Sequence, residues 1–317
     1  MHRITNTLLS ALILGTGGYS HIVAAQDSST YYTVTHAKDF AIDWKSFYAK
    51  GTQATLALQK TLPHQLDLAY GNDPKQKLDI YMPAAKVQDA PVVLFMHGGG
   101  KREGDKSHYG YVAKPFAAKG IVTAVMSYRL FSDDNALKYP AQEDDARNAV
   151  IWLYRNVARF GGNPQNIYLV GHSAGASLTS YLASNRSWLK AAGIPDSAIR
   201  GAVPMGGGTY DITTSKSPVN DSYFATAENK RRATPAFNVN DPAPDWVIQY
   251  GEKEASTDRS GGVEQLKAAL AAEGAKVQVV IEPGADHSNQ VWALGDPATV
   301  TWQSVAALIE RNTQKAH

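Results

Sequence analysis

The 317-residue sequence contains no cysteine, no long uninterrupted apolar run and no excess of one charge. Without cysteine the chain forms no disulfide, so its stability has to come from its core. The 31 lysines and arginines against 29 aspartates and glutamates give a formal net charge of +2. This balance leaves no electrostatic footprint for nucleic acid or an anionic membrane. We therefore expect the partner to be a small molecule.

The first 25 residues have the features of a secretory signal. His2 and Arg3 precede an apolar stretch from Leu8 to Leu14, and small residues at 23–25 suit cleavage by a signal peptidase. The apolar stretch is shorter than the roughly 20 residues that span a bilayer. We therefore favour export with cleavage over a membrane anchor, and expect a periplasmic or secreted mature chain with no membrane span.

The remaining residues, 26–317, have the size and composition of one large α/β domain. Residues 26–63 form a polar N-terminal extension with scattered aromatics, to which the sequence assigns no role; residues 39–62 fit one or two helices. Residues 64–83 alternate between apolar and polar positions around Gly71-Asn72-Asp73-Pro74, which predicts an antiparallel hairpin.

From residue 92 onward, short apolar runs alternate with helical patterns, which is typical of βαβ units in a mostly parallel sheet with helices on both faces. The runs PVVLFM and IVTAVM are unbroken, as expected for parallel strands buried on both sides. The expected strands are 92–96, 121–127, 167–170, 201–204, 246–250 and 277–281. The expected helices are 112–119, 141–158, 174–183, 263–273 and 299–311.

The periodic pattern is interrupted between residues 207 and 245. This segment is rich in turn-forming residues, and a loop of this length inside a compact domain is usually functional or flexible. We expect it to form a short lid or a pocket wall. The alternative is a surface loop with no functional role.

The stretch NIYLVGHSAG, residues 166–175, runs from a buried strand directly into Gly-His-Ser-Ala-Gly. A strand that ends at Gly-x-Ser-x-Gly is typical of a nucleophile elbow, in which a sharp strand-to-helix turn presents the serine hydroxyl above the sheet. The pattern predicts Ser173 as a catalytic nucleophile.

A serine hydroxyl needs a histidine to remove its proton, and that histidine needs a carboxylate to fix its tautomer. Of nine histidines, His287 alone follows the elbow at the end of a late strand, and we predict it as the base; an exposed loop histidine is the alternative. For the acid we favour Glu254, three residues past Gly251, over Asp258. Asp286 ranks third, because neighbouring side chains on a loop seldom face each other.

Acyl transfer creates an oxyanion that needs preorganised hydrogen-bond donors. The expected strand at 92–96 ends in His97 and a run of three glycines at 98–100, a loop typical of lipases and esterases. The backbone N–H of Ala174, at the start of the helix after the nucleophile, would complete an oxyanion hole. No phosphate-binding loop, His-Glu-x-x-His pair or dinucleotide fingerprint is present in the sequence, so no metal or cofactor is implied.

Several motifs together resemble the α/β-hydrolase carboxylesterases, in the branch of feruloyl-esterase-like enzymes and kynurenine formamidases. The resemblance spans residues 66–314 and is carried by YGNDPKQKLDIYMP, HGGG, SYRL, YPAQEDDARNAVIWL, RFGGNPQNIYLVGHSAG and PGADH. It implies an α/β-hydrolase fold, with Ser173 as nucleophile and His287 as base. It also implies Gly98, Gly99 and Ala174 as oxyanion donors, and Asp145 as a structural aspartate. The acid of this family is an aspartate in Gly-x-x-Asp, whereas here that position holds Glu254.

These features predict a serine hydrolase that cleaves small or aryl carboxylic esters through an acyl-enzyme. Hydrolysis of an amide such as an acylformamide is an alternative on the same scaffold, and a non-catalytic binding protein is a third reading. Aromatic residues near the loops that should line the pocket suit an aryl group, although core packing explains aromatics more often than ligand contact does: Tyr109, Tyr111, Tyr210, Tyr223 and Phe224. The oligomeric state is left open by the sequence.

Overall fold

The structure is a computed structural model that describes residues 42–207, 210–240, 243–255 and 262–314. The expected signal segment, the start of the N-terminal extension and Asp258 lie outside the described residues. The architecture and the candidate site therefore concern the chain from residue 42 onward.

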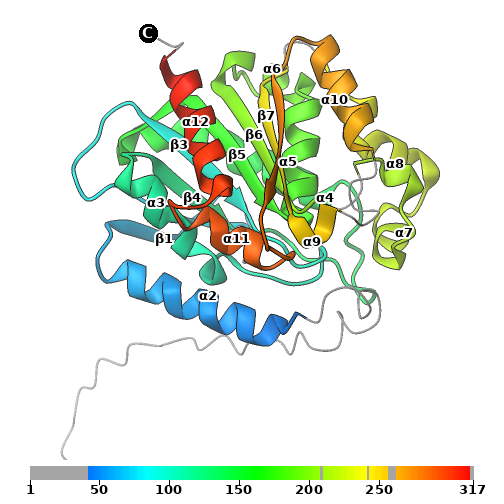
Figure 1. The fold of residues 1–317 in the computed structure, drawn as a ribbon. Helices are drawn as coiled ribbons and strands as arrows, with labels where there is room; N and C mark the ends of the chain where they lie inside the picture. The colour runs from blue at the N-terminus through cyan, green and yellow to red at the C-terminus, as the bar shows by residue number, and fades with distance from the viewer. Residues whose placement is uncertain (1–41, 208–209, 241–242, 256–261, 315–317) are drawn as a thin grey trace, which may run out of the picture.

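One eight-stranded sheet forms the centre of the molecule (Figure 1), in the order β1-β2-β4-β3-β5-β6-β7-β8. β1 pairs antiparallel with β2 and β2 antiparallel with β4, while every other neighbouring pair is parallel. The strands are β1 His64–Ala69, β2 Lys77–Tyr81, β3 Ala90–Met96, β4 Val122–Met126, β5 Gly162–His172, β6 Ile199–Met205, β7 Asp245–Gly251 and β8 Val277–Glu282. The mostly parallel sheet with an antiparallel N-terminal hairpin confirms the predicted fold class.

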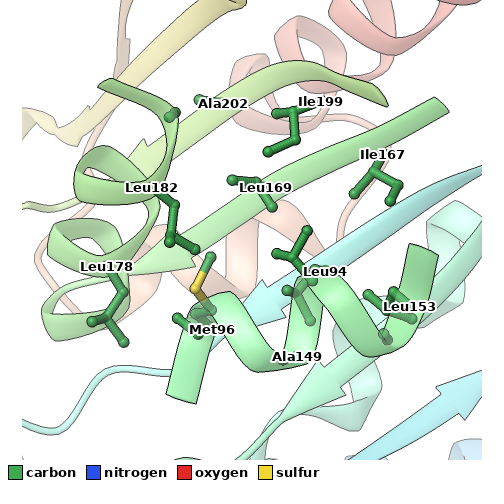
Figure 2. Close-up of a cluster of buried hydrophobic side chains, with 14 of the residues drawn as sticks. Leu94, Met96, Ala149, Leu153, Ile167, Leu169, Leu178, Leu182, Ile199 and Ala202 are labelled. Carbon is green, nitrogen blue, oxygen red and sulfur yellow. The ribbon is translucent and has the colours of Figure 1, made fainter. Parts of the chain in front are cut away.

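Helices cover both faces of this sheet, because the side chains of a buried strand alternate between them. Leu94 and Met96 of β3 face one core with helices α4, α5 and α10, as Figure 2 shows for α4 and α5. Val93 and Phe95 of the same strand face a second core with α2, α3, α11 and α12. These helices are α2 Trp44–Gln59, α3 Ala113–Ala118, α4 Ala141–Asn156, α5 Ala174–Ser184, α10 Val263–Ala272, α11 Asn289–Leu294 and α12 Val300–Gln314.

The expected strands and helices are present, with boundaries shifted by a few residues. β5 is the largest exception, since it begins at Gly162, five residues before the expected start. Gly162 pairs with Ala90 of β3, so the neighbouring strand extends β5 through a polar stretch that the apolar pattern does not mark. Outside the 207–245 segment, the described residues contain short helices that were not expected: α6 Ser187–Ala191, α9 Glu252–Ala255 and α11 Asn289–Leu294.

The 207–245 segment contains ordered structure where the sequence shows no periodicity. Its described part holds helices α7 Pro218–Phe224 and α8 Ala227–Ala233, which lie together beside the sheet in Figure 1. Tyr223 and Phe224 form a small separate core with Phe131 and Ile212. This cluster packs the 207–245 segment against the loop before α4.

Helix α2 belongs to the N-terminal extension and begins with a side-chain cap, since the Asp43 carboxylate accepts a hydrogen bond from Ser46 N at 3.0 Å. In Figure 1 it lies along the lower edge of the molecule, on the side where α9 and α11 follow β7 and β8. Since α9 starts at the carboxyl end of β7, α2 lies at the carboxyl edge of the parallel sheet, where such folds gather their functional loops.

Candidate active site

Ser173 occupies the sharp turn between β5 and α5. Its backbone has φ 55° and ψ −114°, a left-handed conformation that costs a serine about 1–3 kcal/mol. The Ser173 N–H donates to the carbonyl of Met205 on β6 at 2.8 Å, which fixes the turn against the neighbouring strand. The side chain is half-buried, so its hydroxyl remains within reach of a ligand.

Three side chains from separate parts of the sequence form one hydrogen-bonded chain. His287 Nε2 lies 2.9 Å from Ser173 Oγ, and His287 Nδ1 lies 2.5 Å from Glu254 Oε1. Because a carboxylate only accepts, Nδ1 donates to Glu254 and Nε2 is left to accept from the serine hydroxyl. Glu254 is 0% exposed and His287 3% exposed, so the contact between them is shielded from water, whereas the Ser173 end is half-buried.

Glu254 is fixed by two further donors. Its Oε2 accepts from Gly251 N at 3.2 Å and from the Gln290 side-chain amide. Helix α9 starts immediately after β7, so a single helical turn carries this glutamate back towards the strand end. This is how a glutamate fills the position in which the family has an aspartate.

Asp286 does not take part in this chain, although it precedes His287 in sequence. Its carboxylate accepts from the backbone N–H groups of Ser288 and Asn289, both at 2.9 Å. It therefore shapes the start of α11, and the carboxylate beside the imidazole is that of Glu254.

Two polar residues at the site were missed by sequence reasoning. Gln290 holds the acid, as described above, and His172 donates from Nε2 to the carbonyl of His287 at 2.7 Å. Each had a signal in the sequence, because His172 lies inside the elbow motif and Gln290 stands one helical turn after His287. Both contacts support the loop that carries the imidazole.

The glycine loop after β3 lies directly against Ser173. A Cβ atom added to Gly98 would lie 3.0 Å from Ser173 Cβ, and 2.9 Å from His172 Nδ1, so only glycine fits this close approach. Gly99 has φ 127°, a conformation that side chains rarely adopt. Ala174 is the first residue of α5, where helix N–H groups have no partner within the helix. Gly98 and Ala174 therefore lie beside Ser173, and Gly99 follows Gly98 in the same loop.

The His97 side chain packs against this glycine loop. Its ring is stacked on Tyr128, with centroids 4.3 Å apart, and its Nδ1 donates to the carbonyl of Gly98 at 2.7 Å. Burial lowers the pKa of His97 to about 4, so the imidazole is neutral near pH 7. The ring acts as a packed, uncharged support for the loop.

Asp145 is fully buried on α4 and makes the contacts of a structural residue. Its carboxylate accepts from the Arg129 guanidinium and backbone N–H, and from the Gln76 side chain at 2.7 Å. These bonds join α4 to the loop after β4 and to the hairpin, which agrees with the structural role that the resemblance implies.

The N-terminal extension, to which the sequence assigned no role, contacts the site through α2. The Trp44 ring meets the His287 ring edge-on, with centroids 6.0 Å apart. Trp44 is 6% exposed and packs on Phe47 and Tyr48 of the same helix. Helix α2 therefore covers one side of the imidazole.

The aromatic residues expected near the pocket are all buried: Tyr109, Tyr111, Tyr210, Tyr223 and Phe224. Tyr111, for example, is stacked on Trp292 with centroids 4.0 Å apart. Core packing accounts for these rings, and they supply no exposed aryl-binding surface.

A cavity of about 1030 Å³ lies beside the glycine loop. Its walls include Arg102 and Glu103 from that loop and Phe131 and Tyr139 from the segment before α4. Ser173 and His287 are not among its lining residues.

Over the ranges that the structure describes, no three potential metal-ligating side chains gather. Within the same ranges, no helix combines the length and the apolar character needed to cross a bilayer.

The amino-acid sequence is similar to those of several known hydrolases. The sequence profile of the BD-FAE family matches residues 78–191. Kynurenine formamidase from Salmo salar is 28% identical over 253 residues, which cover 78% of this chain and 81% of that protein. Isoprenylcysteine alpha-carbonyl methylesterase from Arabidopsis thaliana is 26% identical over 245 residues, which cover 70% of this chain and 56% of that protein.

Solved structures show the same fold. Esterase B from Lactobacillus rhamnosis matches with a TM-score of 0.66 and 17% identity, covering 86% of this chain and 97% of that one. The sheet order, the strand-to-helix turn at Ser173 and this likeness define an α/β-hydrolase fold. The sequence matches to hydrolases add support for a carboxylesterase-like family within this fold.

Proposed function

We propose that this protein is a serine hydrolase that cleaves small or aryl carboxylic esters through an acyl-enzyme. The observation that carries the proposal is the hydrogen-bonded chain from Ser173 through His287 to Glu254. This arrangement matches the demands of nucleophilic catalysis, in which a base activates the hydroxyl and an acid orients the base.

In the proposed reaction, His287 Nε2 takes the Ser173 proton as Oγ attacks the ester carbonyl. The N–H groups of Gly98, Gly99 and Ala174 bind the resulting oxyanion, where loss of one donor typically costs about 10²–10³ in rate. His287 then gives its proton to the departing alcohol, leaving Ser173 acylated. Water, activated by the same imidazole, releases the acid and restores the serine.

The alternative is hydrolysis of an amide such as an acylformamide on the same residues. It is favoured by the likeness to kynurenine formamidase. The chemistry differs mainly in the leaving group, because an amine has to be protonated as it departs, and His287 is placed to supply that proton. A non-catalytic binding protein would not need the intact hydrogen bonds that join Ser173, His287 and Glu254.

The test is release of p-nitrophenol from p-nitrophenyl acetate. We expect turnover by the wild-type chain and loss of nearly all activity in Ser173→Ala and in His287→Ala. Because the two residues act as a unit, the double variant should lose about as much activity as either single variant. The exposed variant Glu264→Gln is the control and should keep wild-type rates. Absence of turnover together with absence of labelling by a fluorophosphonate probe would support a binding protein, and preference for a formamide over the ester would support the alternative.

We also propose that the chain acts in the periplasm or is secreted, after removal of residues 1–25. The proposal is supported by the basic start, the short apolar stretch and the small residues that follow it. Its small-molecule ester substrate would then be met outside the cytoplasm.

A further inference from the structure

The glycine loop after β3 is held at both of its ends by side chains from other elements. The Tyr128 hydroxyl donates to the carbonyl of His97 at 2.8 Å, just before the glycines. The Gln142 side-chain amide donates to the carbonyl of Lys101 at 2.8 Å, just after them. The glycines at 98–100 therefore lie between two fixed carbonyl groups, and a shift at either end moves the backbone N–H groups between them.

The backbone of Lys101 depends on such contacts, because its conformation is unfavourable. Its φ is 69°, in the left-handed region. This conformation costs free energy in a residue other than glycine, and it persists only where surrounding contacts fix it. The Phe131 N–H, from the loop before α4, donates to the same Lys101 carbonyl at 2.9 Å. Two donors, Phe131 and Gln142, thus hold the end of the glycine loop.

Gln142 lies in the first turn of α4, and its side chain is fully buried. Its amide nitrogen donates to the carbonyl groups of Lys101 and Arg129, each at 2.8 Å. Because carbonyl oxygens only accept hydrogen bonds, the amide nitrogen rather than the amide oxygen faces both of them. One side chain therefore joins the glycine loop to the segment between β4 and α4.

Tyr223 of helix α7 connects this glutamine to the 207–245 segment. The Tyr223 hydroxyl accepts from the Gln142 backbone N–H at 3.1 Å and donates to the Glu143 carboxyl group at 2.6 Å. The buried Lys101 ammonium group lies 5.1 Å from the centre of the Tyr223 ring, within the range of a cation–π contact. Helix α7 therefore contacts both Gln142 and the residue that ends the glycine loop.

We propose that Gln142 is a positioning residue for the oxyanion hole. With Tyr223 behind it, its amide keeps the glycine loop in the conformation that aims the Gly98 and Gly99 N–H groups at the oxyanion. The inference rests on the proposed function, since it assigns these two glycines to the oxyanion hole. It also gives the 207–245 segment a role, because α7 supplies the hydroxyl that holds Gln142.

Gln142→Met tests this role, because methionine is unbranched and similar in length but has no donor for the Lys101 carbonyl. Removal of an oxyanion donor costs about 10²–10³ in rate, and displacement of a donor costs less. We therefore expect kcat for p-nitrophenyl acetate to fall by about 10- to 100-fold with KM unchanged, because only transition-state binding is weakened. Thermal unfolding of each variant gives the folded fraction to which kcat is referred.

Asn312→Leu is the matched control. Asn312 is also buried, and its amide donates to the carbonyl of Arg200 at 2.9 Å. Arg200 lies at the amino end of β6, whereas the site lies at the carboxyl ends of the parallel strands. This variant should lower the unfolding temperature while keeping kcat within about twofold of wild type. An equal loss of kcat in Asn312→Leu and Gln142→Met would assign the loss to general loosening and overturn the positioning role.

Labelling of Ser173 by a fluorophosphonate probe gives a second measurement, which does not need ester turnover. The phosphoryl oxygen of the probe gains negative charge as Ser173 attacks, and the same N–H groups would bind it. We expect the labelling rate of Gln142→Met to fall by at least about tenfold. A kcat and a labelling rate both within about twofold of wild type would overturn the role of Gln142 and leave the ester hydrolase intact.

The same labelling separates failure of this inference from failure of the proposed function. A wild-type chain that is labelled at Ser173 but does not turn over the ester contradicts ester hydrolysis, and the labelling rates then decide the role of Gln142. A chain that is neither labelled nor active has no reactive serine, and both proposals are then wrong.

Tyr223→Phe tests the contribution of α7, because it keeps the ring and removes only the hydroxyl that accepts from the Gln142 N–H. We expect kcat to fall by about 3- to 10-fold with KM unchanged, since Gln142 loses one of its contacts but keeps its amide. A kcat within about twofold of wild type would contradict the role of α7. If Gln142→Met does not fold, the same result for Tyr223→Phe would overturn the whole proposal.

Discussion

The acid of the hydrogen-bonded chain is the residue at which this protein departs from the pattern of the family that it resembles. Glu254 reaches His287 because one helical turn folds its longer side chain back towards β7. Its negative charge fixes the proton on Nδ1, and an amide in its place would favour the wrong tautomer. We expect Glu254→Gln to lower kcat for p-nitrophenyl acetate by about 10³- to 10⁴-fold while the fold is kept.

Two carboxylates provide the comparison for Glu254→Gln. Asp286→Asn should keep kcat within about threefold, because Asp286 contacts backbone N–H groups rather than the imidazole. Asp258→Asn should likewise have little effect. If Asp258→Asn lost more activity than Glu254→Gln, the acid would move to Asp258.

Sequence reasoning reached Ser173, His287 and Glu254 because each stands at a fixed offset from the end of an apolar strand. It missed Trp44, which lies 243 residues before His287 in the sequence and meets it only in the folded chain. The residues around Trp44 form a polar helix with scattered aromatics, and no local sequence pattern there indicates a contact with the catalytic histidine. The contact is visible only once α2 is placed on the sheet.

At the scale of elements, β3 and α5 approach each other closely beside the site. A Cβ atom added to Gly175 would lie 2.1 Å from the carbonyl oxygen of Met96. Glycine to alanine inside a helix normally gains about 1 kcal/mol, but here the new methyl group would meet backbone that leads into the glycine loop. We expect Gly175→Ala to destabilise the protein by about 1–3 kcal/mol and to reduce activity.

Urea unfolding and the p-nitrophenyl acetate assay measure the two effects of Gly175→Ala. Ser177→Ala, a half-buried position on the same helix, is the matched control and should change stability by less than about 1 kcal/mol. Equal stability of the two variants would show that α5 and β3 separate easily, against the geometry described here.

The elements that the sequence predicted best are those with long apolar periods, such as β3, β4 and α4. The helices that it missed are short, at seven residues or fewer. α8, Ala227–Ala233, carries Lys230, Arg231 and Arg232 in seven residues. Such a helix is marginal in isolation and depends on tertiary contacts, here the small core around Tyr223. Apolar periodicity in the sequence therefore does not predict the helices between residues 207 and 245.

For the molecule as a whole, the start of the mature chain can be tested directly. If residues 1–25 are a signal, expression in a bacterial host should yield periplasmic or secreted protein whose first residue by mass spectrometry lies at or next to Gln26. Replacing Leu9 and Leu12 with arginine should keep the chain in the cytoplasm with its first 25 residues attached, because the apolar stretch is lost. Full-length protein in the membrane fraction would instead indicate an anchor.

The amino-acid sequence by itself determined the sheet, its helices, the elbow at Ser173 and the late histidine, because these depend on local apolar periods and on residues at strand ends. Tertiary structure alone decided which carboxylate meets His287, how the polar 162–166 stretch joins β5, and that α2 covers the imidazole. These outcomes depend on contacts between residues far apart in the chain, and no local pattern encodes the distance between such residues.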